Sequence, residues 1–188
     1  NYGLEGVAIP AFTAISAFRN AGFDLMGRHE AYISLCGYAD NPLVLGVVGC
    51  LIIVGGIGFL VIHDLLEYRR TKKLLLHTRI VLVATGLLIL LGTVAIALPE
   101  WNNPATLGPM SPLEKIGNSW FHAVSCRTAG FNSFPLQEMH SSTKLFSILL
   151  MFMGAAPGST GGGIKVTPLA GVFLAVWCVM RGGGDTGV

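Results

Sequence analysis

Two long stretches with almost no charged side chains constrain the fold of this chain more than any other feature. Residues 43–66 include only two acidic or basic side chains, His63 and Asp64, both close to the end, and residues 80–98 carry no charge. Each stretch is near the ~20 residues that an α-helix needs to cross a bilayer. Charged residues make up 12% of the chain, about half the share found in soluble domains. The sequence therefore predicts an all-α integral membrane protein.

The link between these stretches is basic and predicts their orientation. It holds five cations within a short span: Arg69, Arg70, Lys72, Lys73 and Arg79. Short basic links lie on the cytoplasmic side of a membrane, so the first stretch should run inward and the second outward. The segments near residues 28–41 and 100–113 should then be external. A nucleic-acid or lipid-binding patch is the alternative, but beside two spanning helices we expect no nucleic-acid partner.

A tandem repeat organises the chain. Three short segments recur in the same order, and internal repetition of this kind usually fixes the architecture. The pairs are residues 19–24 (RNAGFD) and 127–132 (RTAGFN), displaced by 108 positions, residues 12–16 and 121–125, displaced by 109, and residues 55–57 and 162–164, displaced by 107. The chain therefore divides into a first unit at 1–66, a basic cytoplasmic linker at 67–79 and a second unit at 80–188.

Each unit places the R-[NT]-A-G-F-[DN] signature directly after a short apolar segment. These segments, 9–18 and 113–126, are too short to span a bilayer. Irregular backbone at membrane depth is tolerated where protein buries it or where it lines a water-filled cavity, so we predict two re-entrant pore loops. The second unit then reads as outer helix, pore loop and inner helix. The first unit begins without an outer helix, and we expect the chain to be truncated there.

The signature has the chemistry of an ion-selectivity filter. Potassium filters replace the hydration shell of the ion with backbone carbonyl oxygens, and glycine adopts the backbone angles that such a strand needs. An ordinary tight turn is the alternative, but recurrence after two short apolar segments favours a filter. The predicted filter residues are Asn20, Ala21, Gly22 and Phe23 in the first copy and Thr128, Ala129, Gly130 and Phe131 in the second.

The side chains that flank the filter glycines should face away from the ion. Phe23 and Phe131 are expected to pack behind the filter as wedges. Arg19 and Arg127 precede the two filters, and a guanidinium facing the pathway would repel cations. We therefore expect both arginines to point backward and to bond carbonyl groups or a carboxylate.

The last apolar stretch, residues 145–180, is too long for one span and is interrupted by helix-breaking residues. We predict a helix, an irregular intramembrane segment and a second helix. Beneath a cation filter, such a segment with a lysine could obstruct or gate the pathway, because charge at this depth usually marks function. Snorkelling or a simple ion pair is the alternative for Lys165. The predicted gating residues are Gly154, Pro157, Gly158, Ser159, Thr160, Gly161, Gly162, Gly163 and Lys165.

The cysteines and histidines show no spacing typical of a metal site or a disulfide framework. We expect neither a transition-metal site nor a covalently bound cofactor. An intramembrane enzyme or lipid-handling protein is one rival hypothesis, but the spans hold no carboxylate pair or Ser/His pair. A non-transporting scaffold subunit is another, but a scaffold needs no pair of filter-like strands.

Beyond these motifs, residues 102–109 (NNPATLGP) and 157–165 (PGSTGGGIK) complete a pattern that resembles the Trk/Ktr/HKT superfamily of potassium transporters, most closely its KtrB branch. The resemblance covers nearly the whole chain. It implies four helix–loop–helix repeats around one pore, of which this chain holds most of repeat two and nearly all of repeat three. Gly22 and Gly130 are then the selectivity glycines, and 154–165 is the gating loop.

The resemblance also implies a biological setting. Relatives are multi-pass proteins of the bacterial plasma membrane, form homodimers and bind a cytoplasmic nucleotide-sensing ring of RCK subunits. K⁺ is the expected transported ion, and Na⁺ is a second candidate because Ktr-type systems are often Na⁺-dependent. Two departures stand out. Repeats one and four are absent, so this chain alone cannot close a four-sided filter, and Arg19 stands where many relatives have an uncharged residue.

Overall fold

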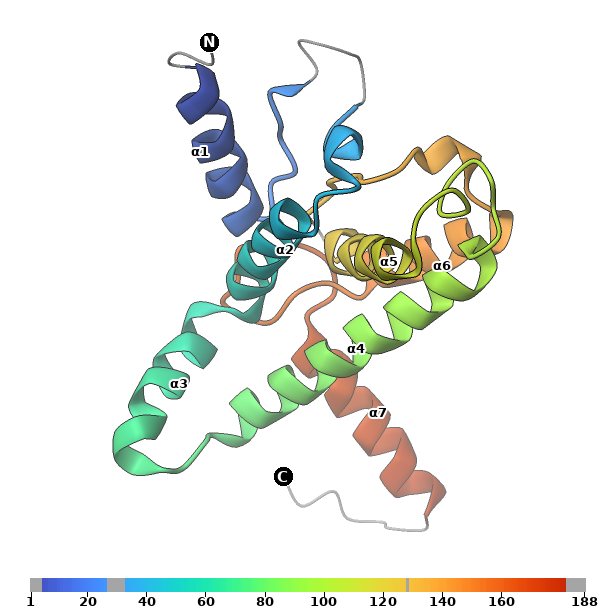
Figure 1. The fold of residues 1–188 in the computed structure, drawn as a ribbon. Helices are drawn as coiled ribbons and strands as arrows, with labels where there is room; N and C mark the ends of the chain where they lie inside the picture. Colours follow the sequence, from blue (N-terminus) through green and yellow to red (C-terminus); the bar gives the residue numbers. More distant parts are fainter. Residues whose placement is uncertain (1–4, 27–32, 128, 182–188) are drawn as a thin grey trace.

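The computed structural model describes residues 5–26, 33–127 and 129–181, and within them the chain is helical (Figure 1). The described residues form no β-strand beyond an isolated bridge between Met153 and Ile164. The α-helices are α1 (Glu5–Phe18), α2 (Pro42–Ile57), α3 (Phe59–Thr71), α4 (Leu76–Glu100), α5 (Pro112–Cys126), α6 (Ser141–Phe152) and α7 (Val166–Met180), with 3-10 turns η2 (Cys36–Tyr38) and η3 (Leu136–Glu138).

The two short apolar segments form helices α1 and α5, and both end directly before a signature. The start of α5 is encoded locally. Ser111 accepts a hydrogen bond from the Glu114 backbone N–H, the Glu114 carboxylate accepts one from the Ser111 N–H, and Pro112 occupies the first turn. This reciprocal capping satisfies backbone donors that a helix start leaves free.

The prediction of one continuous helix over residues 43–66 was wrong. The segment forms two helices, α2 and α3, which meet at 94°. The bend lies at Gly58, whose φ of +91° is a left-handed value that L-residues avoid. A Cβ at Gly58 would also lie 2.8 Å from the Pro157 carbonyl oxygen. The helix therefore breaks where a distant loop packs against it, a tertiary contact that apolar composition does not reveal.

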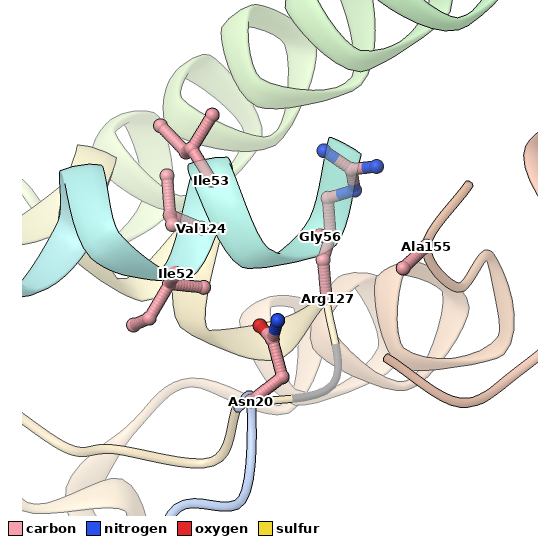
Figure 2. A pocket seen from close by; sticks show the side chains of 7 residues that line it. All are labelled: Asn20, Ile52, Ile53, Gly56, Val124, Arg127 and Ala155. Carbon is pink, nitrogen blue, oxygen red and sulfur yellow. The ribbon is translucent and has the colours of Figure 1, made fainter. Parts of the chain in front are cut away.

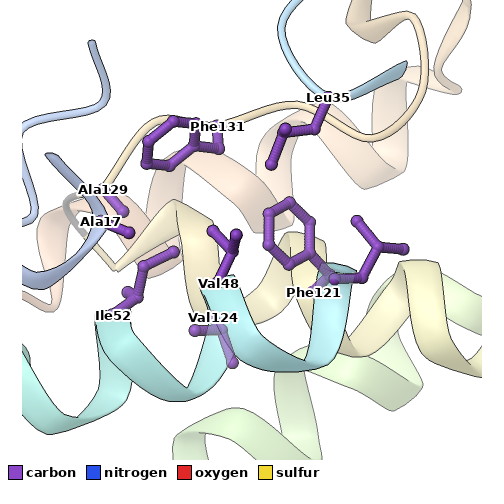
Figure 3. Close-up of a cluster of buried hydrophobic side chains, with 9 residues drawn as sticks. Ala17, Leu35, Val48, Ile52, Phe121, Val124, Ala129 and Phe131 are labelled. Atoms are coloured by element: carbon purple, nitrogen blue, oxygen red, sulfur yellow. The ribbon is translucent and has the colours of Figure 1, made fainter. Parts of the chain in front are cut away.

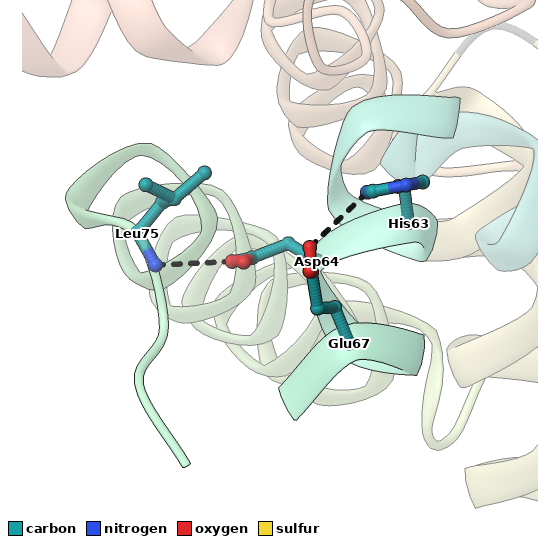
Figure 4. A network of polar contacts seen from close by, with 4 residues as sticks. All are labelled: His63, Asp64, Glu67 and Leu75. Atoms are coloured by element: carbon teal, nitrogen blue, oxygen red, sulfur yellow. Dashed lines mark hydrogen bonds and ion pairs between the residues drawn. The ribbon is translucent and has the colours of Figure 1, made fainter. Parts of the chain in front are cut away.

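Helix α4 fits the predicted outward span. It is the one helix among the described residues that is long and apolar enough to cross a membrane by itself, and α2 with α3 qualifies only if the bent pair counts as one span. The start of α4 is tied to α3 by the buried Asp64, whose carboxylate accepts a hydrogen bond of 3.0 Å from the Leu75 N–H (Figure 4). An acidic group near a helix N-terminus is also favoured by the helix dipole.

The main hydrophobic cluster lies between the two repeat units (Figure 3). Ala17 of α1 and three residues of α2 come from the first unit, whereas Phe121, Val124, Ala129 and Phe131 come from α5 and the segment after it. The loop between α1 and α2 joins them, since the Leu35 N–H donates to the Asn132 carbonyl at 2.9 Å. The two units thus share one core, and this shared core brings their signatures together.

Candidate ion-selectivity site

The first signature follows α1 through a tight cap. The Ala21 N–H donates to the Ser16 carbonyl (2.9 Å) and the Asn20 N–H to the Ala17 carbonyl (3.0 Å), the bond pattern of a Schellman cap. Asn20 occupies its left-handed position with φ of 52°, which asparagine tolerates better than most residues. Residues 21–24, which follow the cap, form no regular secondary structure.

The second signature follows α5 by a shorter version of the same turn. The Ala129 N–H donates to the Ser125 carbonyl (3.0 Å), and the Gly130 N–H reaches the same oxygen (3.1 Å). Ser125 and Ala129 are the repeat partners of Ser16 and Ala21, so the same bond closes both turns, with one residue fewer in the second unit. This missing residue accounts for the change in repeat displacement, from 109 before the turn to 108 after it. Thr128 lies outside the described residues.

The two signatures lie side by side. Gly22 has φ of +70°, and a Cβ added there would lie 2.0 Å from the Ala129 carbonyl oxygen. Real Cβ atoms do not approach backbone this closely, so the contact requires glycine. Gly130 has φ of +89°, but a Cβ there would meet no atom within 4 Å. The structure therefore brings together the two glycines that the sequence singled out, one in contact with the other segment and one facing open space.

The two phenylalanines behave differently. Phe131 is 1% exposed and packs in the shared core, as predicted for a wedge, and its carbonyl accepts a hydrogen bond of 2.6 Å from the Ser125 hydroxyl. Phe23 is 69% exposed, so the prediction that it packs behind its segment was wrong for this chain. The elements that bury Phe131 come from both units, and none of the described elements covers Phe23 in the same way.

Arg127 points away from the signature, into the space between α2 and α4 (Figure 2). It is 8% exposed, and its Nη2 donates to the Thr85 hydroxyl at 3.4 Å. The predicted backward direction is therefore observed, although the partner among the described residues is a hydroxyl rather than a carbonyl or carboxylate. Arg19 is exposed instead. Helix α1 packs mainly on α2, whereas α5 packs against α2, α4 and α6.

A small cavity of about 10 Å³ lies behind the signatures. This is close to the smallest space that holds one water molecule. Two buried polar atoms of its lining residues, Asn20 Oδ1 and Arg127 Nε, have no hydrogen-bond partner. The cavity is lined by Asn20, Ile52, Ile53, Gly56, Val124, Arg127 and Ala155 (Figure 2). The lining thus includes parts of both units and of the segment between α6 and α7.

That segment, residues 153–165, forms a loop closed at its base. The Gly154 N–H donates to the Ile164 carbonyl (3.0 Å) and the Ala155 N–H to the Gly162 carbonyl (3.3 Å). A Cβ at Gly154 would lie 2.0 Å from the Gly162 carbonyl oxygen, so the closure needs a glycine. We name residues 153–165 the intramembrane loop, after the position in the membrane that the sequence predicts for them.

The intramembrane loop packs against the break between α2 and α3. The Ala156 N–H donates to the Gly56 carbonyl (3.0 Å), and the Phe59 N–H donates to the Gly158 carbonyl (3.2 Å). A helix end leaves carbonyls and N–H groups without intrahelical partners, and the loop supplies partners on both sides of the bend. The loop and the bend at Gly58 are therefore complementary.

Lys165 does not project freely from the loop. Its Nζ donates to the Gly161 carbonyl at 2.6 Å, and the side chain is half-buried. The Ser159 hydroxyl donates within the loop as well, to the Ala156 carbonyl at 2.5 Å. The ammonium group thus stabilises a turn of its own loop in the observed conformation.

Sequence reasoning missed a buried carboxylate at the end of α4. Glu100 is fully buried, and its two oxygens accept four hydrogen bonds. The donors are Asn103 Nδ2 (2.7 Å), Thr106 Oγ1 (2.6 Å), the His140 N–H (2.8 Å) and Thr143 Oγ1 (2.6 Å). All four partners donate, so the group anchors the loops at this end of the molecule. An acid just past the charge-free stretch at 80–98, separated by one residue from the Asn-Asn-Pro run at 102–104, was the available signal.

Comparison with known proteins agrees with this arrangement. A family model described as "TrkH: Cation transport protein" matches residues 1–181. The chain belongs to the TrkH family. The superfamily assignment made from the sequence is therefore confirmed, and the family consists of membrane transport proteins rather than enzymes.

Two curated relatives are similar to this TrkH-family chain over almost its whole length. Ktr system potassium uptake protein B from Bacillus subtilis (strain 168) is 40% identical over 186 residues, which cover 98% of this chain and 41% of the relative. The Vibrio alginolyticus protein of the same name is 41% identical over 180 residues, covering 94% of this chain and 38% of the relative. The chain thus spans about two fifths of these relatives.

The fold also matches a solved structure. The potassium transporter TrkH from Vibrio parahaemolyticus superposes with a TM-score of 0.67 and 16% sequence identity, over 93% of this chain and 39% of that protein. At this identity the match supports the all-helical fold of the TrkH family and nothing finer.

Proposed function

We propose that this chain forms part of the ion pathway of a bacterial K⁺ uptake system of the Trk/Ktr type. In this proposal, residues 20–23 and 128–131 are two sides of a selectivity filter that coordinates K⁺ through backbone carbonyl oxygens. Helices α1 and α5 are pore helices, and each precedes its filter segment. Selective permeation by carbonyl rings needs no catalytic side chain or resident cofactor.

The contact between Gly22 and Ala129 is the observation that carries this proposal. Two segments far apart in sequence, related by the repeat and each containing a left-handed glycine, meet at the ends of two short helices. Ordinary tight turns would not need to converge on one another. The exposed space at Gly130 is where we place the ion pathway. The names of the relatives, which are potassium uptake proteins, support the choice of K⁺.

The intramembrane loop is proposed as the gate of this pathway. It lies against the end of α1, where the first filter segment begins, since the Thr160 hydroxyl is 3.2 Å from the Phe18 carbonyl. Its glycines permit rearrangement, and Lys165 holds one turn of it closed. Opening would then require the loop to leave the α2–α3 bend.

The setting of the proposed transporter follows its relatives. We propose that it works in the plasma membrane with the linker at 67–79 in the cytoplasm, as a homodimer bound to a nucleotide-sensing RCK subunit. Na⁺ is proposed as a second ion, in symport or as an activator, because a relative from Enterococcus hirae is named a potassium/sodium uptake protein.

Uptake of Rb⁺, a tracer for K⁺, tests the proposal. The full-length parent protein is expressed, with an RCK subunit, in cells that lack their own K⁺ uptake systems. We expect uptake by the parent protein and its loss in Gly130→Asp, with an unchanged amount of protein in the membrane. A carboxylate at Gly130 would enter the proposed pathway, obstruct it and trap cations there.

Gly117→Ala is the matched control, because this glycine lies in α5, where a Cβ would meet nothing within 4 Å. It should leave uptake unchanged. If the expressed parent protein takes up no Rb⁺, the transport proposal is wrong. If the parent protein transports and Gly130→Asp transports equally well, the filter assignment is wrong.

A further inference from the structure

The side chain of Asn20 joins the first filter segment to the intramembrane loop. Its Nδ2 donates a hydrogen bond of 3.0 Å to the Thr160 hydroxyl, across 140 positions of sequence. Asn20 is 7% exposed, whereas Thr160 lies on the exposed side of the contact. The bond connects the first residue of a filter segment directly to the loop proposed as the gate.

The Thr160 hydroxyl is also fixed from its other side. Its oxygen is 3.2 Å from both the Phe18 carbonyl and the Gly55 carbonyl. A hydroxyl has one hydrogen to donate and can accept at the same time. Thr160 can therefore accept from Asn20 while it donates to the end of α1 or of α2, which makes it the meeting point of three elements.

The backbone geometry around this point is specialised for the contact. Asn20 holds φ of 52°, which directs its side chain from the turn toward the loop. A Cβ at Gly55 would lie 1.9 Å from the Phe18 carbonyl oxygen, so only glycine lets α2 pass close enough for Thr160 to reach both carbonyls. The repeat partner of Asn20 is Thr128, which has no amide to donate. The link thus belongs to the first unit, the one against which the loop packs.

We propose that Asn20 is a positioning residue that latches the intramembrane loop to the filter through Thr160. The proposal rests on the proposed function and adds a specific device to it. In the observed conformation the loop is held against the end of α1. Transport then requires this bond to break, so weakening it favours the open pathway.

The test compares uptake kinetics of the full-length protein with the RCK subunit present. Thr160→Val keeps the shape of the side chain and removes the hydroxyl, so we expect the maximal rate of Rb⁺ uptake to rise about fivefold, as the loss of one ordinary net hydrogen bond shifts an equilibrium. The KM for Rb⁺ should stay unchanged, because the filter carbonyls remain. Thr160→Ser restores the hydroxyl and should restore the parent rate.

Thr93 provides the matched control, because it allows the same substitution outside the filter segments and the loop. Its hydroxyl donates within α4, to the Ile89 carbonyl at 2.7 Å, so Thr93→Val should leave the maximal rate unchanged. Asn20→Gly tests the same bond from the other side and keeps the left-handed backbone accessible. It should raise the rate as Thr160→Val does, and the double variant should be no faster than either single variant.

Several results would overturn the latch. An unchanged or reduced uptake rate in Thr160→Val, at a normal level of protein in the membrane, contradicts it. The latch is also contradicted if Thr160→Ser raises the rate as Thr160→Val does. Effects that multiply in the double variant show that the two side chains act independently. If Thr160→Val does not accumulate, Asn20→Gly alone decides by the same rate criterion. These failures differ from failure of the proposed function, in which the parent protein itself transports no Rb⁺.

Discussion

The two repeat units begin from related sequences and reach different degrees of enclosure. In the second unit, α5 is packed by α2, α4 and α6, Phe131 is buried and Ser125 bonds its carbonyl. In the first unit, α1 packs mainly on α2, Phe23 is exposed and the Ser16 hydroxyl has no partner. The comparison teaches that the repeated sequence determines the backbone turns. The elements packed around each unit determine which of its side chains are buried and hydrogen-bonded.

The helices that follow the break restart at the same place in the two units. Helix α3 begins at Phe59 and α7 at Val166, displaced by the same 107 positions as the Gly-Gly-Ile match. The first unit turns there through a single residue, Gly58, whereas the second forms the intramembrane loop. By the same displacement, residues 153–165 of this loop correspond to residues 46–58 of the first unit, which are helical up to Ile57. The same region of the repeat is therefore helix in the first unit and loop in the second, and this loop packs against the bend of the first unit.

Replacing the two glycines of the proposed filter should give the largest contrast. Gly22→Ala places a Cβ against the Ala129 carbonyl and adds about 1–2 kcal/mol of backbone strain, so we expect Rb⁺ uptake to fall to background. Gly130→Ala carries the strain without the clash and should retain part of the uptake. Equal loss of uptake in both variants, at equal membrane levels, would show that the contact between the segments is unimportant.

The two phenylalanines should differ in their effect on stability. Phe131→Ala empties a buried position, so it should lower the free energy of unfolding by roughly 3–5 kcal/mol. Phe23→Ala removes an exposed ring and should cost far less. Thermal unfolding in detergent, followed by fluorescence, measures both. A Phe23→Ala variant as unstable as Phe131→Ala would mean that Phe23 is buried in the complete transporter.

The buried carboxylate of Glu100 anchors the loops at the end of α4, and its replacement tests this anchor. Glu100→Gln keeps the shape but removes the charge and turns one acceptor into a donor that faces other donors. Hydrogen bonds to a charged group contribute about 1.5–3 kcal/mol, and we expect a loss of stability of about that size in the same unfolding assay. Glu114→Gln, on the exposed start of α5, is the control. A Glu100→Gln variant as stable as this control would contradict the anchor.

The paired serines should give the smallest contrast. Ser125→Ala removes the hydrogen bond to the Phe131 carbonyl and should cost about 1 kcal/mol. Ser16→Ala removes a buried hydroxyl without a partner and should be neutral or slightly stabilising. Urea or thermal unfolding of the two variants in parallel measures this difference. If Ser16→Ala is less stable than Ser125→Ala, the comparison is wrong.

The sequence by itself determined the helical membrane class, the duplication, the two short helices and the signatures that follow them. These features are local, because hydrophobic length, capping residues and glycine positions act within a few turns. The change in displacement from 109 to 108 also located the one-residue difference between the signature turns of the two units, and the hydrogen bonds that the Ser16 and Ser125 carbonyls accept reproduce it.

Only the tertiary structure decided the bend at Gly58, the burial of one phenylalanine but not the other, the hydrogen bonds of Glu100 and the contact of Asn20 with Thr160. Each depends on residues that lie far apart in sequence. His140 and Thr143 reach Glu100 within the second unit, whereas the other contacts form between the two units. The apolar run at 43–66 reads as one helix because hydrophobicity reports length, not the hydrogen-bond partners that a distant loop supplies. Packing within the second unit and between the two units set these positions.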